Sequence, residues 1–245
     1  MRYKIFLFIF LIPIVNSCKK ENMCDCVKSS GTRIGTYRDL TNFNCINISD
    51  KIDLYLTQGN NFEVRVEAGS NLQSLIKTEM DGETLKVFNN NRCNWVRGYN
   101  DIIKVYVTAP YFKHVLNNGL GTIETTNTIS QDLITFRAAN SGDIKLTVNT
   151  GTLKASAHGN GDIYLTGITG SLENDYNGSS SLYAADLQVT NYVYLHSVTI
   201  GNAYVNAPLN GYMDIGIDQI GNIYYKGNPK FINLKQNSTG KLIKQ

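Results

Sequence analysis

From about residue 115 to its end, the chain repeats one short pattern of small, polar and apolar positions. Each copy has a glycine or another small residue, one residue of variable type, and an apolar residue that opens a brief alternating strand. These opening positions are 123, 144, 163, 182, 204, 223 and 242, so the steps are 21, 19, 19, 22, 19 and 19 residues. A period near twenty residues over seven copies predicts a solenoid with one coil for each copy.

The alternation within each copy predicts which side chains face inward. Successive side chains of a strand point to opposite sides, so Ile163 and Leu165 should point into the coil, and Asp162 and Tyr164 out of it. Stacked coils pair their backbones about 4.8 Å apart and bury an apolar column that one coil cannot bury alone. The predicted column contains Ile123, Ile144, Ile163, Leu182 and Ile223. Tyr204 falls at the same position by this count, and its size predicts a local distortion.

Residues 44–110 show strand patterns without this period. Apolar residues mostly alternate with polar ones around Ile46 to Leu56, Phe62 to Val66, Leu85 to Val87 and Ile103 to Val107. Residues 72–78 fit either one helical turn or a further strand, and residues 89–101 form a polar loop around the only tryptophan, Trp95. We expect this irregular region to cap one end of the solenoid and the charged segment 235–245 to protect the other end from edge-to-edge pairing.

The first residues have the pattern of a bacterial lipoprotein signal. Arg2 and Lys4 precede an apolar run, residues 5–15, that is too short to span a bilayer. The run ends in Val-Asn-Ser-Cys, which resembles a lipobox and implies lipid on Cys18 as the first mature residue. The alternative is an ordinary secretory signal followed by a coincidental cysteine. The expected organisation is a signal peptide at 1–17, a tether at 18–42 and a single β-helical domain at 43–245.

The residue after Cys18 predicts the membrane that holds the anchor. Lys19 stands where an aspartate would be the usual inner-membrane retention signal. By that analogy the chain is an outer-membrane lipoprotein of the cell envelope, with its domain on the periplasmic face or at the cell surface. Its first expected partner is therefore the membrane, through the lipid anchor.

Four further cysteines suggest a disulfide, because exported proteins fold in oxidising surroundings. We favour a bond from Cys93 to Cys24 or Cys26, which would fasten the tether to the domain. Cys45 lies in an alternating strand pattern and is interpreted as a buried free thiol. Metal ligation by Cys24, Cys26 and Cys93 is disfavoured, because a Cys-x-Cys spacing is tighter than structural zinc sites use.

Several segments together resemble a known family. They are the strand 50–56, the segment Val66-Glu67-Ala68-Gly69-Ser70-Asn71-Leu72, the loop 91–97, the Gly-Asp-Ile and Gly-Asn-Ile copies, and the closing segment 221–229. The resemblance is to the auto-transporter adhesin, head GIN domain family, over about residues 43–243. It implies an all-β fold, a right-handed parallel β-helix-like solenoid, here with repeats of about 19–22 residues. Adhesion is implied by the family name, and the family provides no catalytic residue to carry over.

Composition and motifs argue against nucleic-acid binding, metal binding and catalysis. Charged residues make up 18% of the chain and its net charge is +3, without the concentrated basic face that nucleic-acid binding requires.

The segment 159–165 resembles one calcium-binding nonapeptide, but a step of nineteen residues favours turn-forming roles for its Gly, Asn and Asp. His114, His158 and His196 lack metal or catalytic spacing and are interpreted as structural. Outward Asp143, Asp162, Lys145 and Lys154 do not form a lyase-like cluster, so we expect no enzyme activity, no cofactor and no metal.

Outward aromatic residues are the candidate binding groups. A tyrosine stripe along one sheet can stack on sugars or contact a protein, and the alternative is cross-strand stacking that stabilises the sheet. Trp95 has the same two interpretations, as a binding tip or as loop packing. The candidate residues are Tyr164, Tyr183, Tyr194, Tyr224 and Trp95. The predicted function is adhesin-like binding of a surface, glycan or protein ligand, with a non-adhesive envelope scaffold or a glycan-active enzyme as alternatives.

Overall fold

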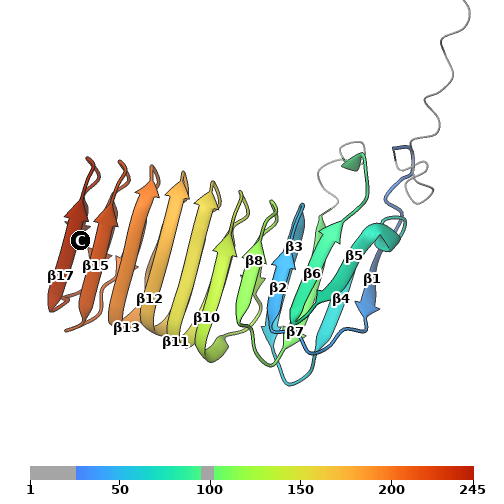
Figure 1. The fold of residues 1–245 in the computed structure, drawn as a ribbon, viewed down its shortest axis with the longest axis horizontal. Helices are drawn as coiled ribbons and strands as arrows, with labels where there is room; N and C mark the ends of the chain where they lie inside the picture. The colour runs from blue at the N-terminus through green and yellow to red at the C-terminus, as the bar shows by residue number, and fades with distance from the viewer. Residues whose placement is uncertain (1–25, 95–101) are drawn as a thin grey trace, which may run out of the picture.

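The computed structural model describes residues 26–94 and 102–245, and it is a parallel β-solenoid of about seven turns (Figure 1). The predicted all-β solenoid is therefore confirmed. Cys18, Cys24 and Trp95 lie outside the described residues, as does the signal peptide. Within the described part of the chain, no helix is long and apolar enough to cross a bilayer.

The coils have two long faces. The first face contains, in spatial order, β1 (Arg33–Arg38), β4 (Glu63–Gly69), β7 (Ile103–Ala109), β3 (Ile52–Gln58), β9 (Ile123–Thr125), the first halves of β11 (Ile144–Gly159), β12 (Ile163–Gly178) and β13 (Leu182–Thr199), then β14 (Ala203–Asn206), β16 (Ile223–Lys226) and β18 (Leu242–Lys244). The second face contains β5 (Ile76–Asp81), β6 (Thr84–Asn89), β2 (Cys45–Ile48), β8 (His114–Asn117), β10 (Ile129–Ala138), the second halves of β11 to β13, β15 (Tyr212–Ile217) and β17 (Phe231–Gln236).

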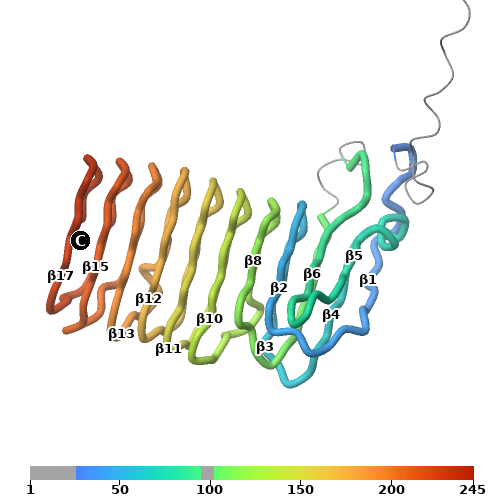
Figure 2. The backbone as a smooth tube through the Cα atoms, viewed as in Figure 1, coloured from blue at the N-terminus to red at the C-terminus, as the bar shows by residue number. Residues whose placement is uncertain are grey.

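The N-terminal coils stack out of sequence order, as the backbone tube shows (Figure 2). Strand β2 pairs with both β6 and β8, and β3 pairs with both β7 and β9, so the first coil lies between two later ones. Ile46 therefore has Leu85 and Val115 as its register partners, which are far away in sequence. This order explains why residues 44–110 carry strand patterns without the twenty-residue period.

Antiparallel strands close the N-terminal end. Strand β1 pairs with β4 and β4 with β7 on the first face, while β5 pairs with β6 on the second. Residues 72–78 contain both expected alternatives, because a short 3-10 helix (Gln73–Leu75) leads directly into β5. Strand β1 lies inside the expected tether 18–42, so Arg33–Arg38 belongs to the fold. Its weak signal reflects an edge strand whose first three residues are exposed.

The predicted apolar column is present, with one correction. Ile123, Ile144, Ile163, Leu182 and Ile223 are register partners in successive coils and are fully buried, and Ala203 completes the column between the last two. The expectation that Tyr204 occupies this column was wrong, because Leu182 pairs with Ala203 and Tyr183 pairs with Tyr204. The repeat count took Tyr204, the larger residue, in place of Ala203, and so shifted the inward position of this coil by one residue. A one-residue shift moves a side chain to the opposite face of the strand.

The Gly-Asp-Ile and Gly-Asn-Ile copies join successive coils through their polar side chains. Asp143 Oδ1 accepts a hydrogen bond from the Asp162 backbone N–H at 2.9 Å, and Asp162 Oδ1 accepts one from Ser181 at 2.8 Å. Asn202 and Asn222 bond in the same way to the coils that follow them, each at 2.9 Å. These oxygens therefore satisfy backbone donors at the corners, which supports the turn-forming interpretation of the motif.

Among the described residues, the last strands each pair with one neighbour, β17 with β15 and β18 with β16. Phe231 and Leu234 of β17 are exposed, and Ile232 and Leu242 are only half-buried against the core. Exposed lysines surround this edge: Lys230, Lys235, Lys241 and Lys244. Positive charges on an edge strand oppose pairing with another copy of the same strand, as expected for the charged C-terminal segment.

Candidate binding surfaces

A tyrosine ladder runs along the outside of the first face. Its four rings stand in register on successive coils: Tyr164, Tyr183, Tyr204 and Tyr224. Neighbouring ring centroids are 4.8, 5.6 and 5.1 Å apart, and the ring planes differ by 9 to 11°. The structure thus brings together the predicted Tyr164, Tyr183 and Tyr224, and it adds Tyr204, which the shifted count had placed inside.

The ladder covers its own ring faces. Each inner ring lies between two others, and at one end Lys145 Nζ lies 5.8 Å from the centroid of Tyr164. The same outward row continues through a second stacked pair, Tyr55 and Tyr106, whose centroids are 4.9 Å apart, and Arg65 covers Tyr106 at 4.2 Å. A sugar or an apolar side chain packs on an open ring face, so this row offers mainly ring edges and hydroxyls.

Truncating the middle of the ladder should destabilise the fold. Tyr183→Ala removes two stacked contacts, each worth about 0.5–1.5 kcal/mol, so we expect a loss of about 1–3 kcal/mol in the free energy of unfolding, measured in urea. Tyr37→Ala is the matched control, since Tyr37 is 65% exposed on the edge strand β1. Equal unfolding midpoints for the two variants would show that stacking contributes nothing.

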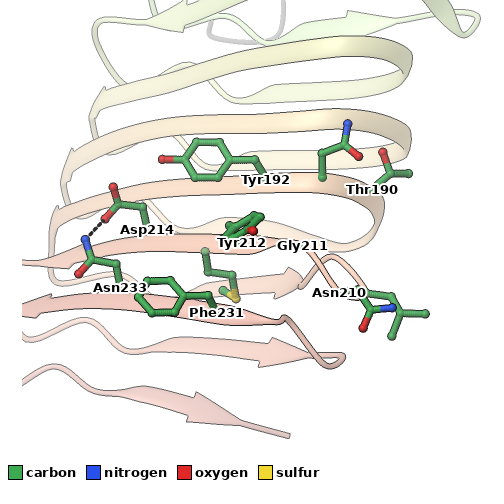
Figure 3. A pocket seen from close by; sticks show the side chains of 11 residues that line it. Thr190, Tyr192, Asn210, Gly211, Tyr212, Asp214, Phe231 and Asn233 are labelled. Carbon is green, nitrogen blue, oxygen red and sulfur yellow. Dashed lines mark hydrogen bonds between the residues drawn. The ribbon is translucent and has the colours of Figure 1, made fainter.

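A groove on the second face collects a different set of aromatic residues. Tyr192, Tyr212 and Phe231 are register partners on β13, β15 and β17, at the C-terminal end of the solenoid. They line a hollow of about 710 Å³ (Figure 3). Tyr212 is 49% and Phe231 58% exposed, and Figure 3 shows the rings of Tyr192 and Phe231 face-on and the ring of Tyr212 nearly edge-on. The remaining lining residues are Thr190, Asn191, Leu209, Asn210, Gly211, Met213, Asp214 and Asn233.

Extra residues at the coil corners create this groove. The pairing of β12 with β13 shifts register twice, between Tyr164 and Thr166 and between Thr169 and Ser171, so β13 holds two more residues than β12 over the same span. Such bulges bend a strand and re-aim its side chains. The second shift sets Thr190 and Asn191 at the groove wall, and the turn 207–211, in which Asn210 adopts φ 60°, forms the adjoining wall.

One side of the groove is polar. Asn233 Nδ2 donates a hydrogen bond to Asp214 Oδ1 at 3.0 Å, and both residues lie beside the aromatic row. The Tyr192 hydroxyl points toward Asp214 (Figure 3). Burial, followed by the negative charge of Asp214, raises the pKa of the Tyr192 phenol, so this hydroxyl stays protonated at neutral pH. The groove thus combines ring faces with a carboxylate, an amide and a phenol.

The predicted candidate Tyr194 lies on the second face, apart from the ladder. It is the register partner of Asp214 and lines a smaller hollow of about 240 Å³ together with Lys154, Glu173 and Asp175. The Lys154 ammonium and the Glu173 carboxylate form an ion pair at 2.6 Å across two coils. Tyr192 belongs to this second face as well.

Cysteines and histidines take mainly structural positions. The structure joins Cys26 to Cys93, one of the two pairings expected. Cys45 is a free thiol but is half-buried, not buried: Ile46 and Ile48 point inward, so alternation places Cys45 on the outer side.

His196 lies between two carboxylates, 3.0 Å from Asp218 and 3.5 Å from Asp175. Among the described residues, no group of three or more His, Cys, Asp or Glu side chains is placed to hold a metal ion.

The sequence contains a second periodic pattern, outside the inward positions of the repeat, that marks the groove. Tyr192, Tyr212 and Phe231 are spaced by 20 and 19 residues, the same period as the inner column. An aromatic residue at this spacing on neighbouring coils marks one outward row. Asp214 and Asn233 follow the same spacing, two positions after the aromatic residues.

The sequence profile of one family matches residues 42–229, and that family is described as "Putative auto-transporter adhesin, head GIN domain". The chain belongs to this family. The matched residues of the head GIN domain therefore contain β2 to β16, including the tyrosine ladder and the β13 and β15 walls of the groove, whereas β1 and β17 lie outside them. Among curated proteins, no match is found.

Solved structures share the fold of this head GIN domain. One, described as a putative adhesin from Bacteroides fragilis, has a TM-score of 0.77 at 19% identity and covers 89% of this chain and all of its own. A putative adhesin from Parabacteroides merdae has a TM-score of 0.65 at 14% identity, covering 89% of this chain and 98% of its own. A protein described as a putative lipid binding protein from Parabacteroides distasonis has a TM-score of 0.65 at 19% identity, covering 89% and 100%. At these identities the likeness establishes the fold alone.

Proposed function

We propose that this protein is an adhesin-like binding protein of the bacterial cell envelope, anchored in the outer membrane by lipid on Cys18, and that the groove at Tyr192, Tyr212 and Phe231 is its binding surface. The exposed ring faces of the groove carry this proposal. The family and two of these solved neighbours are described as putative adhesins, and the third neighbour as a putative lipid binding protein. These descriptions support a binding role.

The position of the groove suits a protein held at its N-terminus. The described chain begins at Cys26, whose disulfide to Cys93 places it at the capped end. Strands β15 and β17, which line the groove, lie at the opposite end (Figure 1). Nine strand spacings separate β5 from β17 on the second face, which is roughly 43 Å at about 4.8 Å each. A lipid before residue 26 would thus hold the capped end near the membrane and leave the groove far from it.

The anchor makes a direct prediction. Cys18→Ala should move the protein from the membrane fraction to the soluble fraction and abolish incorporation of labelled fatty acid. Each buried methylene of an acyl chain contributes about 0.8 kcal/mol, and stable anchoring requires two or more chains. Nothing else expected of the mature chain, residues 18–245, would replace them. Cys24→Ala is the control and should remain membrane-bound. A Cys18→Ala protein that still partitions with membranes would contradict the anchor.

The binding role is tested with the full-length protein on lipid-coated beads, after equal loading has been verified. We expect the beads to be retained on at least one of three surfaces, namely mucin, peptidoglycan or collagen. The double variant Tyr212→Ala/Phe231→Ala should lose this retention, whereas Tyr37→Ala, at the capped end, should keep it. Retention that does not depend on the groove, or no retention on any surface, would reject the proposal and favour an envelope scaffold.

A further inference from the structure

We propose that the groove between Tyr192 and Phe231 binds a neutral sugar unit of a glycan chain. This inference rests on the proposed binding function and names the ligand class of the same site. It follows from three properties of the groove: open ring faces, a fixed pair of polar groups, and the sign of its charge.

The ring faces provide the apolar half of a sugar site. A pyranose has one face rich in C–H groups, and such a face packs well against an aromatic ring, whose π face is electron-rich. Tyr212 and Phe231 are 49% and 58% exposed, and they stand on adjacent coils at the spacing of paired strands. The tyrosine ladder of the first face lacks this property, because its rings already cover one another.

Asp214 and Asn233 provide the polar half. The carboxylate accepts hydrogen bonds at two oxygens, and the Asn233 amide already holds Oδ1 at 3.0 Å, which fixes the orientation of both groups. Sugar hydroxyls both donate and accept, so they can donate to the carboxylate and to the phenol oxygen of Tyr192, and accept from the second N–H of the Asn233 amide. A few well-placed polar groups beside apolar walls are the usual composition of a site that orients a small ligand.

Charge selects neutral sugars over acidic ones. The lining contains one carboxylate, that of Asp214, and no lysine, arginine or histidine. An anionic group placed in the groove, such as a uronate, sialate, sulfate or phosphate, would meet that carboxylate without a compensating cation among the lining residues. The five lysines at positions 226–244 are not among the lining residues.

The polar share of the lining disfavours an acyl chain. Seven of the eleven lining residues carry hydrogen-bonding side chains: Thr190, Asn191, Tyr192, Asn210, Tyr212, Asp214 and Asn233. A hydrocarbon covering them would remove their water without replacing its hydrogen bonds, which costs free energy for each buried polar group. A sugar replaces those bonds, so the same lining favours it.

The test uses the full-length protein in mild detergent and saturation-transfer NMR. The probes are neutral oligosaccharides built from hexoses and N-acetylhexosamines, and an acidic set containing uronate, sialate or sulfate. Phosphatidylcholine vesicles are tested separately, without detergent, on the protein held on lipid-coated beads. We expect at least one neutral probe to bind, with acidic counterparts at least tenfold weaker. Tyr212→Ala, Phe231→Ala and the nearly isosteric Asp214→Asn should each weaken that binding at least tenfold, while Tyr37→Ala and Tyr183→Ala leave it unchanged.

Each other outcome overturns the inference. Binding of neutral sugars that survives all three groove variants, or that is lost in Tyr183→Ala, would place the site elsewhere. Preference for acidic sugars, groove-dependent vesicle binding, or no saccharide binding at all would exclude the neutral-sugar assignment. Groove-dependent retention of beads without any saccharide binding would leave the proposed function standing and point to a protein ligand, so the two failures are distinguishable.

Discussion

Replacing Gly161 by alanine is expected to destabilise the solenoid by about 2–3 kcal/mol, through a direct collision between coils. A Cβ added at Gly161 would overlap the backbone carbonyl of Gly142 in the preceding coil. The same relation holds between Gly142 and Gly121 and between Gly240 and Gly221. Overpacking of this kind costs about 1–3 kcal/mol, and because the obstacle is backbone and not a flexible side chain, we expect the upper part of that range.

The measurement is the urea midpoint of unfolding, with Gly35→Ala as the matched control. A Cβ at Gly35 would meet only the far end of the Arg65 side chain, which can move aside. The control should therefore be neutral or slightly stabilising, since alanine restricts the unfolded chain more than glycine does. If both variants shift the midpoint equally, close coil stacking is not the reason for glycine at position 161.

The repeat could be predicted because its causes are local. An inward apolar residue and a small corner residue recur in each coil, and an Asp or Asn stands between them in four of the seven copies. Each makes its contact with the coil one period away, as Asp143 does with Asp162. Where the coil adjacent in space is also the next repeat in the sequence, the repeat pattern is enough to predict the fold. Pattern reading therefore works from Ile123 onward, and the parallel solenoid follows from it.

The failures have equally specific causes. Ala203 was passed over because a small residue gives a weak hydrophobic signal, and the one-residue error hid Tyr204 from the ladder. The groove depends on two extra residues in β13, which change the geometry of one corner but leave the period almost unchanged. The stacking of β2 and β3 between later coils could not be predicted from a repeat in the sequence, because β2 and β6 are separated by a different length of chain from β3 and β7.

Removal of the Cys26–Cys93 disulfide should lower the free energy of unfolding by about 2–4 kcal/mol. The two cysteines are 67 residues apart, and in the chain-entropy description a loop of that length restricts the unfolded state by up to about 4 kcal/mol. The bond also fastens the segment that precedes β1, an edge strand held otherwise by β4 and by an ion pair of 2.5 Å between Arg33 and Glu67. We expect β1 to exchange its amide hydrogens faster once the bond is gone.

The appropriate variant is Cys26→Ala/Cys93→Ala, because Cys24 stands two residues from Cys26 and would remain as a competing partner after a single change. Cys45→Ala is the control: Cys45 is a free thiol outside the bond, and its loss should leave the midpoint nearly unchanged. Reductant should lower the midpoint of the wild-type protein and of the control but not of the double variant. Equal midpoints with and without reductant in the wild-type protein would mean that the antiparallel cap, and not the covalent link, holds the N-terminal end. In that case the contacts of β4 and β5 with the first coils supply the stability assigned to the disulfide, and the variants to make next are in those strands.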